Sequence, residues 1–148
     1  MREAVFSSLE SMGALDGASV VDLFAGTGAL GIEALSRGAS RAVFVDIDAV
    51  ALAAVQSNLE STGMTQRGHV VRSDVVRFLE RRDAVFDLAF ADPPYEFQAW
   101  EDVLTRLGAG VAVLESNREL DLDGRWRTVK HKRYGDTVVT VVVQRADD

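Results

Sequence analysis

Short apolar runs alternate along this chain with stretches in which apolar residues recur at helical spacing. The runs predict five strands, at residues 20–24, 41–46, 69–72, 86–91 and 110–115. The periodic stretches predict a helix over residues 2–12 and a second one that follows a glycine turn at 25–31 and ends at residue 37. Two more helices are predicted to begin after Asp48 and after Asp74, and a fifth spans residues 97–107. Strands that alternate with helices imply a parallel, doubly wound sheet with right-handed crossovers.

The end of the chain has a different pattern. Residues 125–132 and 137–144 predict two strands joined by Tyr134-Gly135-Asp136, which is typical of a hairpin. The hairpin would add an antiparallel strand to the parallel sheet. We therefore predict an α/β fold in one domain over residues 1–148, with ligands bound at the carboxyl ends of the parallel strands.

The composition excludes several kinds of chemistry. The chain has no cysteine, which rules out disulfides, thiolate zinc sites and cysteine nucleophiles. Its only histidines, His69 and His131, are far apart in sequence, so no metal site is predicted. The net charge of −7 argues against indiscriminate nucleic-acid binding, although a local basic patch is compatible with it. No apolar run approaches the roughly 20 residues that span a bilayer and no signal peptide is recognisable, so we expect a cytoplasmic protein without membrane contact.

A glycine turn follows the first predicted strand and leads into the next helix. Gly26, Gly28 and Gly31 match G-x-G-x-x-G, and Asp46 ends the next strand about 20 residues on, where a ribose-binding acid belongs. This pattern alone fits a dinucleotide as well as S-adenosylmethionine. Asp22 favours the second, because a carboxylate at this spot would repel a pyrophosphate and attract an ammonium or a sulfonium. The helix N-terminus after Gly28 can receive the carboxylate of the methionine part.

Two of the acids also have a purely structural interpretation. Asp74 could accept a hydrogen bond from an adenine amine, or it could cap the helix that follows it. Both roles are compatible, because the side chain of Asp74 can serve one of them and its backbone the other. Asp46 could be a turn residue at the end of its strand, an interpretation that its spacing from the glycines disfavours.

The fourth predicted strand runs into Asp92-Pro93-Pro94-Tyr95. The prolines fix the backbone of this loop and present carbonyl groups without neighbouring N–H donors. A rigid, acceptor-rich loop with an aromatic ring fits a flat, amine-bearing group, whereas the simpler interpretation is a surface turn after a core strand. In the first case the Asp92 carboxylate and the Pro93 carbonyl would hold the hydrogens of the amine. Tyr95 would stack on a nucleobase, a contact worth roughly 1–3 kcal/mol.

With these motifs in order, the chain resembles class I S-adenosylmethionine-dependent methyltransferases, in which Asp/Asn-Pro-Pro-Tyr/Phe marks enzymes that methylate exocyclic amines of nucleobases. Residues 2–6, 22–39 and 134–137 are similar to the 16S ribosomal RNA guanine-N2 methyltransferase D family, and the likeness runs from Arg2 to about Gln144. The resemblance implies a Rossmann-like class I methyltransferase fold with S-adenosylmethionine as cofactor and no metal. It also implies methyl transfer to the N2 amine of a guanine in 16S rRNA, at a site of the guanine-966 type.

The motifs and the resemblance together define the predicted site. The residues predicted for methyl transfer are Asp92, Pro93, Pro94 and Tyr95. The residues predicted to bind the cofactor are Asp22, Phe24, Gly26, Thr27, Gly28, Asp46, Ile47, Asp74, Val75 and Asp92. Glu115, at the end of the fifth predicted strand, could line the acceptor pocket but is not assigned to the site.

The resemblance also implies the partner and an N-terminal difference. The partner would be 16S rRNA, free or within the small ribosomal subunit, bound by a monomer. Members of that family usually begin further upstream with a basic, strand-forming extension that helps to grip RNA. Here Met1 falls directly before the first predicted helix, so this extension is expected to be missing.

Three other functions stay open at this point. An adenine-N6 DNA methyltransferase would use the same tetrapeptide, but no segment is long enough for the target-recognition region that such enzymes generally carry. A nicotinamide-dependent oxidoreductase and a cofactor-binding module without catalysis are the others.

Five of the 16 basic residues lie in the predicted hairpin: Arg125, Arg127, Lys130, Lys132 and Arg133. A solvated face is the first interpretation of this cluster. A secondary RNA contact is the second, since alternation along a strand would place Lys130 and Lys132 on one face.

Overall fold

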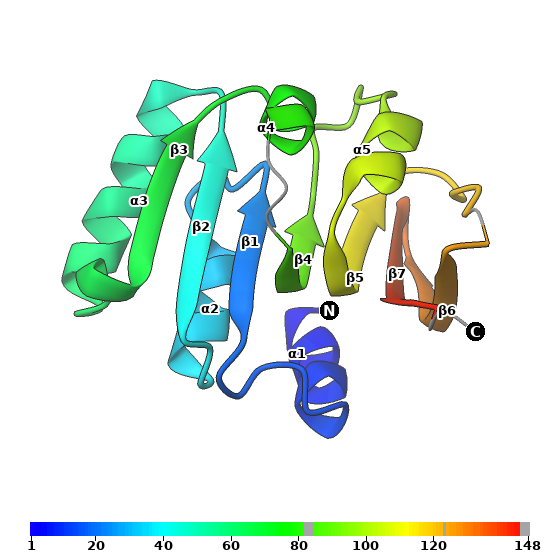
Figure 1. Ribbon diagram of the computed structural model, residues 1–148, viewed down its shortest axis with the longest axis horizontal. Coiled ribbons are helices and arrows are strands. Elements are labelled where there is room, and N and C mark those ends of the chain that lie inside the picture. Colours follow the sequence, from blue (N-terminus) through cyan, green and yellow to red (C-terminus); the bar gives the residue numbers. More distant parts are fainter. Residues whose placement is uncertain (82–84, 123, 146–148) are drawn as a thin grey trace.

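A computed structural model describes residues 1–81, 85–122 and 124–145. A seven-stranded sheet runs through the molecule in the order β3-β2-β1-β4-β5-β7-β6 (Figure 1). The strands are β1 (Ser19–Leu23), β2 (Arg41–Asp46), β3 (Gly68–Arg72), β4 (Phe86–Ala91), β5 (Ala109–Ser116), β6 (Trp126–Tyr134) and β7 (Thr137–Gln144). The helices are α1 (Arg2–Ser11), α2 (Ala29–Ser36), α3 (Ala49–Ser61), α4 (Val75–Arg81), α5 (Trp100–Arg106) and the short 3-10 helix η1 (Thr65–Arg67).

The sheet has the predicted mixture of parallel and antiparallel strands. Strands β1 to β5 pair in parallel, and β7 pairs antiparallel with β5. Strand β6, the first strand of the hairpin, pairs antiparallel with β7 and forms the edge of the sheet. This confirms the predicted α/β fold. The helix predicted across residues 97–107 begins only at Trp100, because Phe97 belongs to the preceding turn, where its N–H donates to the Pro94 carbonyl at 3.0 Å.

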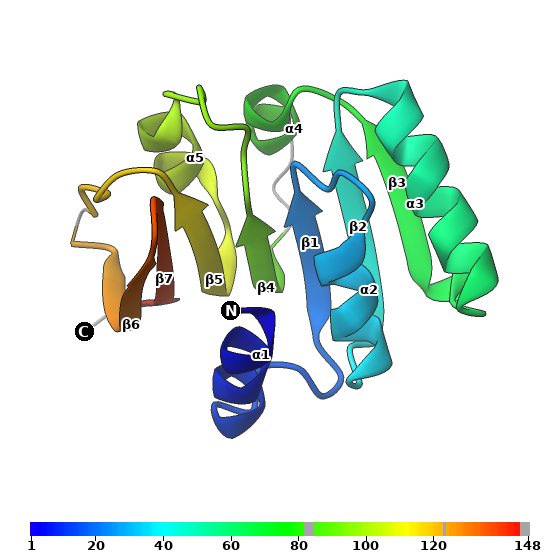
Figure 2. The same cartoon turned by 180° about the vertical axis from the view of Figure 1, so that it is seen from behind.

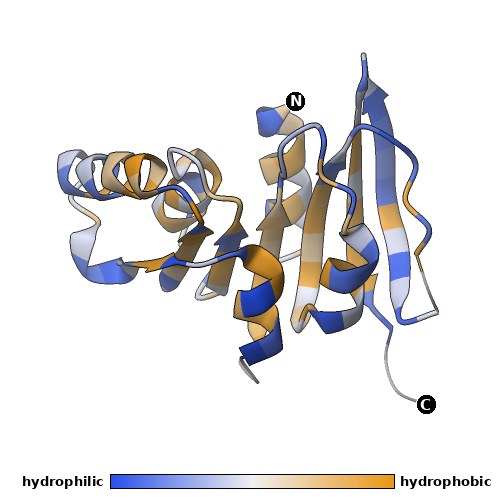
Figure 3. Ribbon diagram, turned by 90° about the horizontal axis from the view of Figure 1, so that it is seen from above, coloured by the Kyte–Doolittle hydropathy of each residue, from blue (hydrophilic) through white to orange (hydrophobic). Residues whose placement is uncertain are grey.

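Helices cover both faces of the sheet (Figure 2). On one face, α1, α2 and α3 pack through Phe6, Leu35 and Leu59 against Phe44 and Phe90 of the strands. On the other face, a second cluster joins α4 and α5 to the strands and includes Phe78, Trp100 and Trp126. The central strands are largely hydrophobic, as buried parallel strands must be, whereas the edge strand β6 carries many hydrophilic residues (Figure 3). No helix in the described part of the chain is both long and apolar enough to cross a membrane.

The strand order creates a topological switch point between β1 and β4. From the central strand β1 the chain proceeds outward to β2 and β3, and then returns to place β4 on the other side of β1. The loops that follow β1 and β4 therefore diverge, and they open a crevice at the carboxyl ends of these two strands. The glycine turn follows β1 and residues 92–95 follow β4, so both predicted motifs lie at this crevice.

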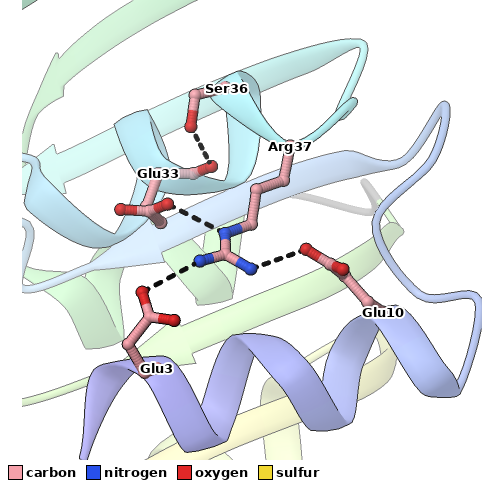
Figure 4. A network of polar contacts seen from close by, with 5 residues as sticks. All are labelled: Glu3, Glu10, Glu33, Ser36 and Arg37. Carbon is pink, nitrogen blue, oxygen red and sulfur yellow. Dashed lines mark hydrogen bonds and ion pairs between the residues drawn. The ribbon is translucent and has the colours of Figure 1, made fainter.

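Arg37 attaches the first helix to the second (Figure 4). Its guanidinium forms ion pairs with Glu33 of its own helix at 2.8 Å and with Glu10 and Glu3 of α1 at 2.6 and 3.2 Å. The same group lies 5.1 Å from the centre of the Phe6 ring. The hydrogen bonds to Glu33 and Glu10 raise the pKa of Arg37 further. The N-terminal end of α1 is thereby held beside the crevice.

Candidate active site

The glycine turn has a backbone that few residues other than glycine adopt. Gly26 and Gly28 have φ values of 58° and 83°, and Gly28 is the N-cap of α2. Phe24 also has a positive φ, of 60°, which is uncommon for a bulky residue and marks a strained turn. Gly31 packs so closely on Phe44 that a Cβ atom there would lie 2.4 Å from the ring. These constraints fix the path of the chain between β1 and α2.

Asp46 holds the glycine turn in place. One of its carboxylate oxygens accepts the N–H of Gly26 at 2.9 Å, and the other accepts the N–H of Asp48 at 2.9 Å. The side-chain amide of Asn58 donates to the Thr27 carbonyl at 2.9 Å. The end of β2 and helix α3 thus brace the turn from one side, and the carboxylate of Asp46 lies against its backbone.

Asp22 is a buried acid in β1, just before the glycine turn. It is only 2% exposed, and its carboxylate accepts the N–H of Gly31 at 3.0 Å. Burial raises the pKa of Asp22 to about 8, although the bond from Gly31 opposes the shift and the carboxylates of Asp92, Asp46 and Glu115 add to it. A cation bound next to Asp22 would favour its ionised form.

A cleft of about 410 Å³ opens beside Asp22, and we call it the first cleft. Its size suits a small-molecule ligand. The described residues that line it are Met1, Arg2, Val5, Asp22, Phe24, Ala25, Gly26, Thr27, Ala29, Leu30, Asp92, Val113 and Glu115. Helix α1 therefore contributes one wall, which the motifs along the chain did not predict.

The remaining residues predicted for the cofactor lie at the same edge of the sheet but outside the described lining of the first cleft. Asp74 follows β3 and caps α4, because its carboxylate accepts the N–H of Arg77 at 3.0 Å. Of the two interpretations of Asp74, the structure shows the helix cap. Val75 is buried as the first residue of α4, and Ile47, after β2, is 64% exposed.

The Asp-Pro-Pro-Tyr loop, residues 92–95, is held in place at its far end. The side-chain amide of Asn117 donates to the Tyr95 carbonyl at 2.7 Å. The ring of Phe97 packs edge-on against the rings of Phe24 and Trp100, with distances of 4.9 and 5.7 Å between ring centres. The contact with Phe24 connects the loop to the glycine turn. The side chain of Tyr95 is left 75% exposed, so its ring is free to contact a ligand.

A second cleft of about 340 Å³ lies along this loop. The described residues that line it are Asp92, Pro93, Pro94, Tyr95, Phe97, Trp100, Glu115, Ser116, Asn117, Asp136 and Thr137. Asp92 and Glu115 line both clefts, so the two spaces meet at these two carboxyl groups. All four residues predicted for methyl transfer thus lie together on one cleft, adjacent to the space beside Asp22.

The carboxyl groups of Asp92 and Glu115 lie close enough to influence each other's protonation. Two partly buried carboxylates repel each other when both are ionised, which favours a proton on one of them. Partial burial and the neighbouring Asp92 raise the pKa of Glu115 to about 7, against the opposing effect of Arg2. Loss of hydration also raises the pKa of Asp92, although the interaction with the Glu115 carboxyl group works in the other direction.

Sequence reasoning left Glu115, Asn117 and Asp136 out of the site. Glu115 had one usable signal, its place at the end of a strand. Asp136 lies in the hairpin turn, and only the pairing of β7 with β5 brings that turn to the second cleft. No group of three or more potential metal-ligating side chains gathers within the described ranges.

The basic residues of the hairpin divide into different environments. Arg125 is directed inward, where it donates to the carbonyls of Leu104 and Leu107 and lies 4.9 Å from the Trp126 ring. For this residue the interpretation as part of a solvated face is wrong. The ammonium of Lys130 donates to Ser8 of α1 at 2.9 Å.

Comparison with known proteins gives a consistent picture. Residues 1–143 match the model of the family described as conserved hypothetical protein 95. A Bacillus subtilis protein provisionally named rRNA methyltransferase YlbH is 35% identical over 158 residues, covering 98% of this chain and 85% of the relative. Ribosomal RNA small subunit methyltransferase D of Escherichia coli is 33% identical over 107 residues, which cover 72% of this chain and 52% of the relative. The match thus spans about half the length of that relative.

The fold has a close counterpart among solved structures. A protein from Escherichia coli, provisionally titled methyltransferase yhhF, superposes with a TM-score of 0.88 at 26% identity and covers 99% of this chain and 85% of that one. The comparisons confirm the resemblance that the sequence motifs indicated. The chain therefore belongs to the family described as conserved hypothetical protein 95, and it is a methyltransferase with a Rossmann-like fold.

Proposed function

We propose that the chain transfers a methyl group from S-adenosylmethionine to the exocyclic N2 amine of a guanine in 16S rRNA of the small ribosomal subunit, at the guanine-966-type position. The meeting of the two clefts at Asp92 is the observation on which the proposal depends. Methyl transfer needs one space for the donor and one for the acceptor, with the reacting atoms close together where they join. The names of the Bacillus and Escherichia coli relatives support ribosomal RNA as the substrate.

The residues around the first cleft fit S-adenosylmethionine. This cofactor, when bound, supplies an electrophilic methyl group on a sulfonium. Asp22, Asp92 and Glu115 surround the cleft with three carboxyl groups, and Arg2 is the one basic side chain in its described lining. The pKa values of Asp22 and Glu115 are raised, so without a positive charge nearby these acids tend to be protonated. A ligand with an ammonium and a sulfonium would provide that positive charge.

The backbone of the glycine turn and the acids at the strand ends complete the cofactor site in this proposal. Gly28 opens α2, whose N-terminal N–H groups would receive the ligand's carboxylate. Each Asp46 oxygen accepts one N–H and keeps a second lone pair, so the carboxylate can also accept hydrogen bonds from ribose hydroxyls. Asp74 can cap α4 and accept a hydrogen bond from the adenine amine, while Ile47 and Val75 would flank the ring.

The residues along the second cleft would bind the acceptor base. Tyr95 offers an exposed ring for stacking, and Asp92 and Pro93 offer acceptors for the two hydrogens of the amine. The lone pair of an exocyclic amine is delocalised into the ring, so holding both hydrogens aims that lone pair at the methyl group. As the bond from nitrogen to the methyl carbon formed, the bond from sulfur to that carbon would break and S-adenosylhomocysteine would leave as a neutral thioether. The nitrogen would become cationic and acidic and release one proton. Asp92 is within reach to receive it.

The test is methyl transfer with labelled cofactor to small ribosomal subunits, free 16S RNA and duplex DNA. We expect incorporation into RNA or subunits, at the N2 position of a guanine, and a loss of at least about 100-fold for Asp92→Ala. Calorimetry with S-adenosylmethionine and with NAD separates a loss of catalysis from a loss of cofactor binding. Incorporation only into DNA, binding of NAD in place of S-adenosylmethionine, or wild-type turnover by Asp92→Ala would contradict the proposal.

A further inference from the structure

The adjacency of Asp92 and Glu115 follows from the register of two neighbouring strands. Strands β4 and β5 pair in parallel with Phe90 opposite Val113 and Ala91 opposite Leu114. The next residues along the two strands are Asp92 and Glu115, so their side chains leave the sheet together at its carboxyl edge. Both side chains line the first and the second cleft, so the register brings the two carboxyl groups to the place where the clefts meet.

The described lining of the second cleft is rich in acceptors and contains no basic side chain. Its carboxyl groups are those of Asp92, Glu115 and Asp136, and Pro93 adds a carbonyl. The amide of Asn117 is already used on Tyr95, and the hydroxyl of Ser116 donates to the Arg118 carbonyl at 2.7 Å. Such a cleft favours a base that presents several N–H donors on one edge.

Guanine presents its donors in the arrangement that this pair can accept. The N1–H and the N2 amine are neighbours on the Watson–Crick edge and point in nearly parallel directions. Adenine has an amine beside a lone pair at N1, and that lone pair would face a carboxylate unfavourably. Two neighbouring carboxylates, when both are ionised, therefore complement guanine and disfavour adenine.

We propose that Glu115 is the specificity-determining residue of this site, whose carboxylate accepts the N1–H of the target guanine while Asp92 holds the N2 amine. The assignment rests on the proposed function and adds a residue to it. Recognition of guanine needs Glu115 in its ionised form, and the N–H donors of the base would stabilise that form against the burial that raises the pKa of Glu115. The charged groups that act on the pair are Arg2 from α1 and Asp22 from β1, and Asp136 lies across the cleft.

The test uses 2-aminopurine at the target position of 16S RNA. This base keeps the N2 amine but has a lone pair where guanine has the N1–H. The wild type should therefore prefer guanine strongly in kcat/KM. In Glu115→Gln the side-chain amide can turn its N–H toward that lone pair, and the preference should shrink by about 10-fold or more. 2-Aminopurine also lacks the O6 atom of guanine. Wild type and Glu115→Gln are therefore each measured with both bases, and the effect of the missing O6 cancels because it is common to the two proteins.

A second readout is binding without catalysis. The affinities of cofactor-free wild type and Glu115→Gln for the two RNAs should show the same change in preference. Glu60→Gln is the control, since it removes an exposed carboxylate on α3, outside the lining of both clefts, and should leave the guanine preference unchanged. Calorimetry with the cofactor checks that Glu115→Gln keeps the first cleft intact.

The outcomes separate the two proposals. If the wild type methylates guanine and Glu115→Gln keeps the full preference over 2-aminopurine, Glu115 does not recognise N1–H and the inference fails. The inference also fails if Glu60→Gln reduces the preference as much as Glu115→Gln does. If the wild type methylates no guanine in RNA at all, the proposed function itself fails, and that result precedes any comparison of variants.

Discussion

At the scale of single residues, the protonation of Asp22 links cofactor binding to pH. With a pKa of about 8, the buried carboxyl group is mostly protonated at neutral pH. A cationic ligand favours the ionised form, so binding has to release a proton whenever the pH is below 8. We expect the affinity for S-adenosylmethionine to rise between pH 6 and pH 8, by at most about 10-fold per pH unit for each proton released, and to level off above pH 8.

The measurement is calorimetry at several pH values in buffers that differ in ionisation enthalpy, which counts the released protons directly. Glu115, with a pKa of about 7, would contribute at the lower end of the range. Asp22→Asn should bind more weakly and lose the part of the pH dependence that is centred near 8. Unchanged proton release by this variant would show that another group is responsible.

The same shift has a consequence for folding. Asp22 has an ordinary pKa of 3.8, so between pH 3.8 and 8 the folded protein holds a proton that the unfolded chain has released. The contribution of Asp22 to stability is therefore present in full below pH 3.8 and is lost as the pH rises through 8. Asp22→Asn should flatten this part of the stability curve.

At the scale of elements, one side chain adds a polar attachment to the packing of the buried residues of α1. Arg37 bridges Glu3 and Glu10 of α1 to Glu33 of α2, with its side chain 22% exposed. Isolated surface ion pairs contribute little, but a guanidinium with three carboxylate partners forms a network. We expect Arg37→Met to lower the melting temperature by roughly 2–4 °C and to weaken cofactor binding, because Arg2 and Val5 of α1 line the first cleft.

Thermal unfolding and calorimetry measure the two effects. Arg41→Met is the matched control, since Arg41 is an exposed arginine on β2 with no polar side-chain partner among the described residues. If both variants lose the same stability, the network around Arg37 has no special role. High salt should reduce the difference between Arg37→Met and wild type only in part, because the guanidinium is partly shielded from solvent.

Elements were predictable where burial produces a distinctive sequence pattern. The bounds of β2, β4 and β7 agree with the predicted runs, because strands buried in a sheet are continuously apolar. Helix η1 was not predicted, since three residues are too few to show a period. Within the site, the glycine turn and residues 92–95 were recognisable because their backbones require particular residues. The pairing of Asp92 with Glu115 was not, because it depends on the register between two strands that are distant in sequence.

At the scale of the whole molecule, an acidic protein has to bind an acidic polymer if the proposed function is correct. The net charge of −7 makes long-range attraction to RNA unfavourable, so binding needs a local basic surface. Strand β6 supplies candidates at the edge of the sheet, next to the hairpin turn that borders the second cleft. Arg127, Lys130 and Lys132 pair with Val143, Val141 and Val139, so they share one face despite the register shift between Thr128 and Lys130.

The contribution of this face can be measured from the salt dependence of RNA binding. Lys130 is engaged with Ser8, whereas Arg127 and Lys132 are exposed. If each of these two neutralises one phosphate, the variant Arg127→Glu/Lys132→Glu should weaken binding and reduce the slope of log K against log salt by about 1 for each phosphate that is no longer neutralised. Arg41→Glu, on the opposite half of the sheet, adds a like charge reversal away from the hairpin and should leave the slope unchanged. An equal change of slope in both variants would mean that net charge alone governs binding. An unchanged slope in the double variant would place the RNA on another face. The RNA would then have to reach the second cleft without contacting this face of β6.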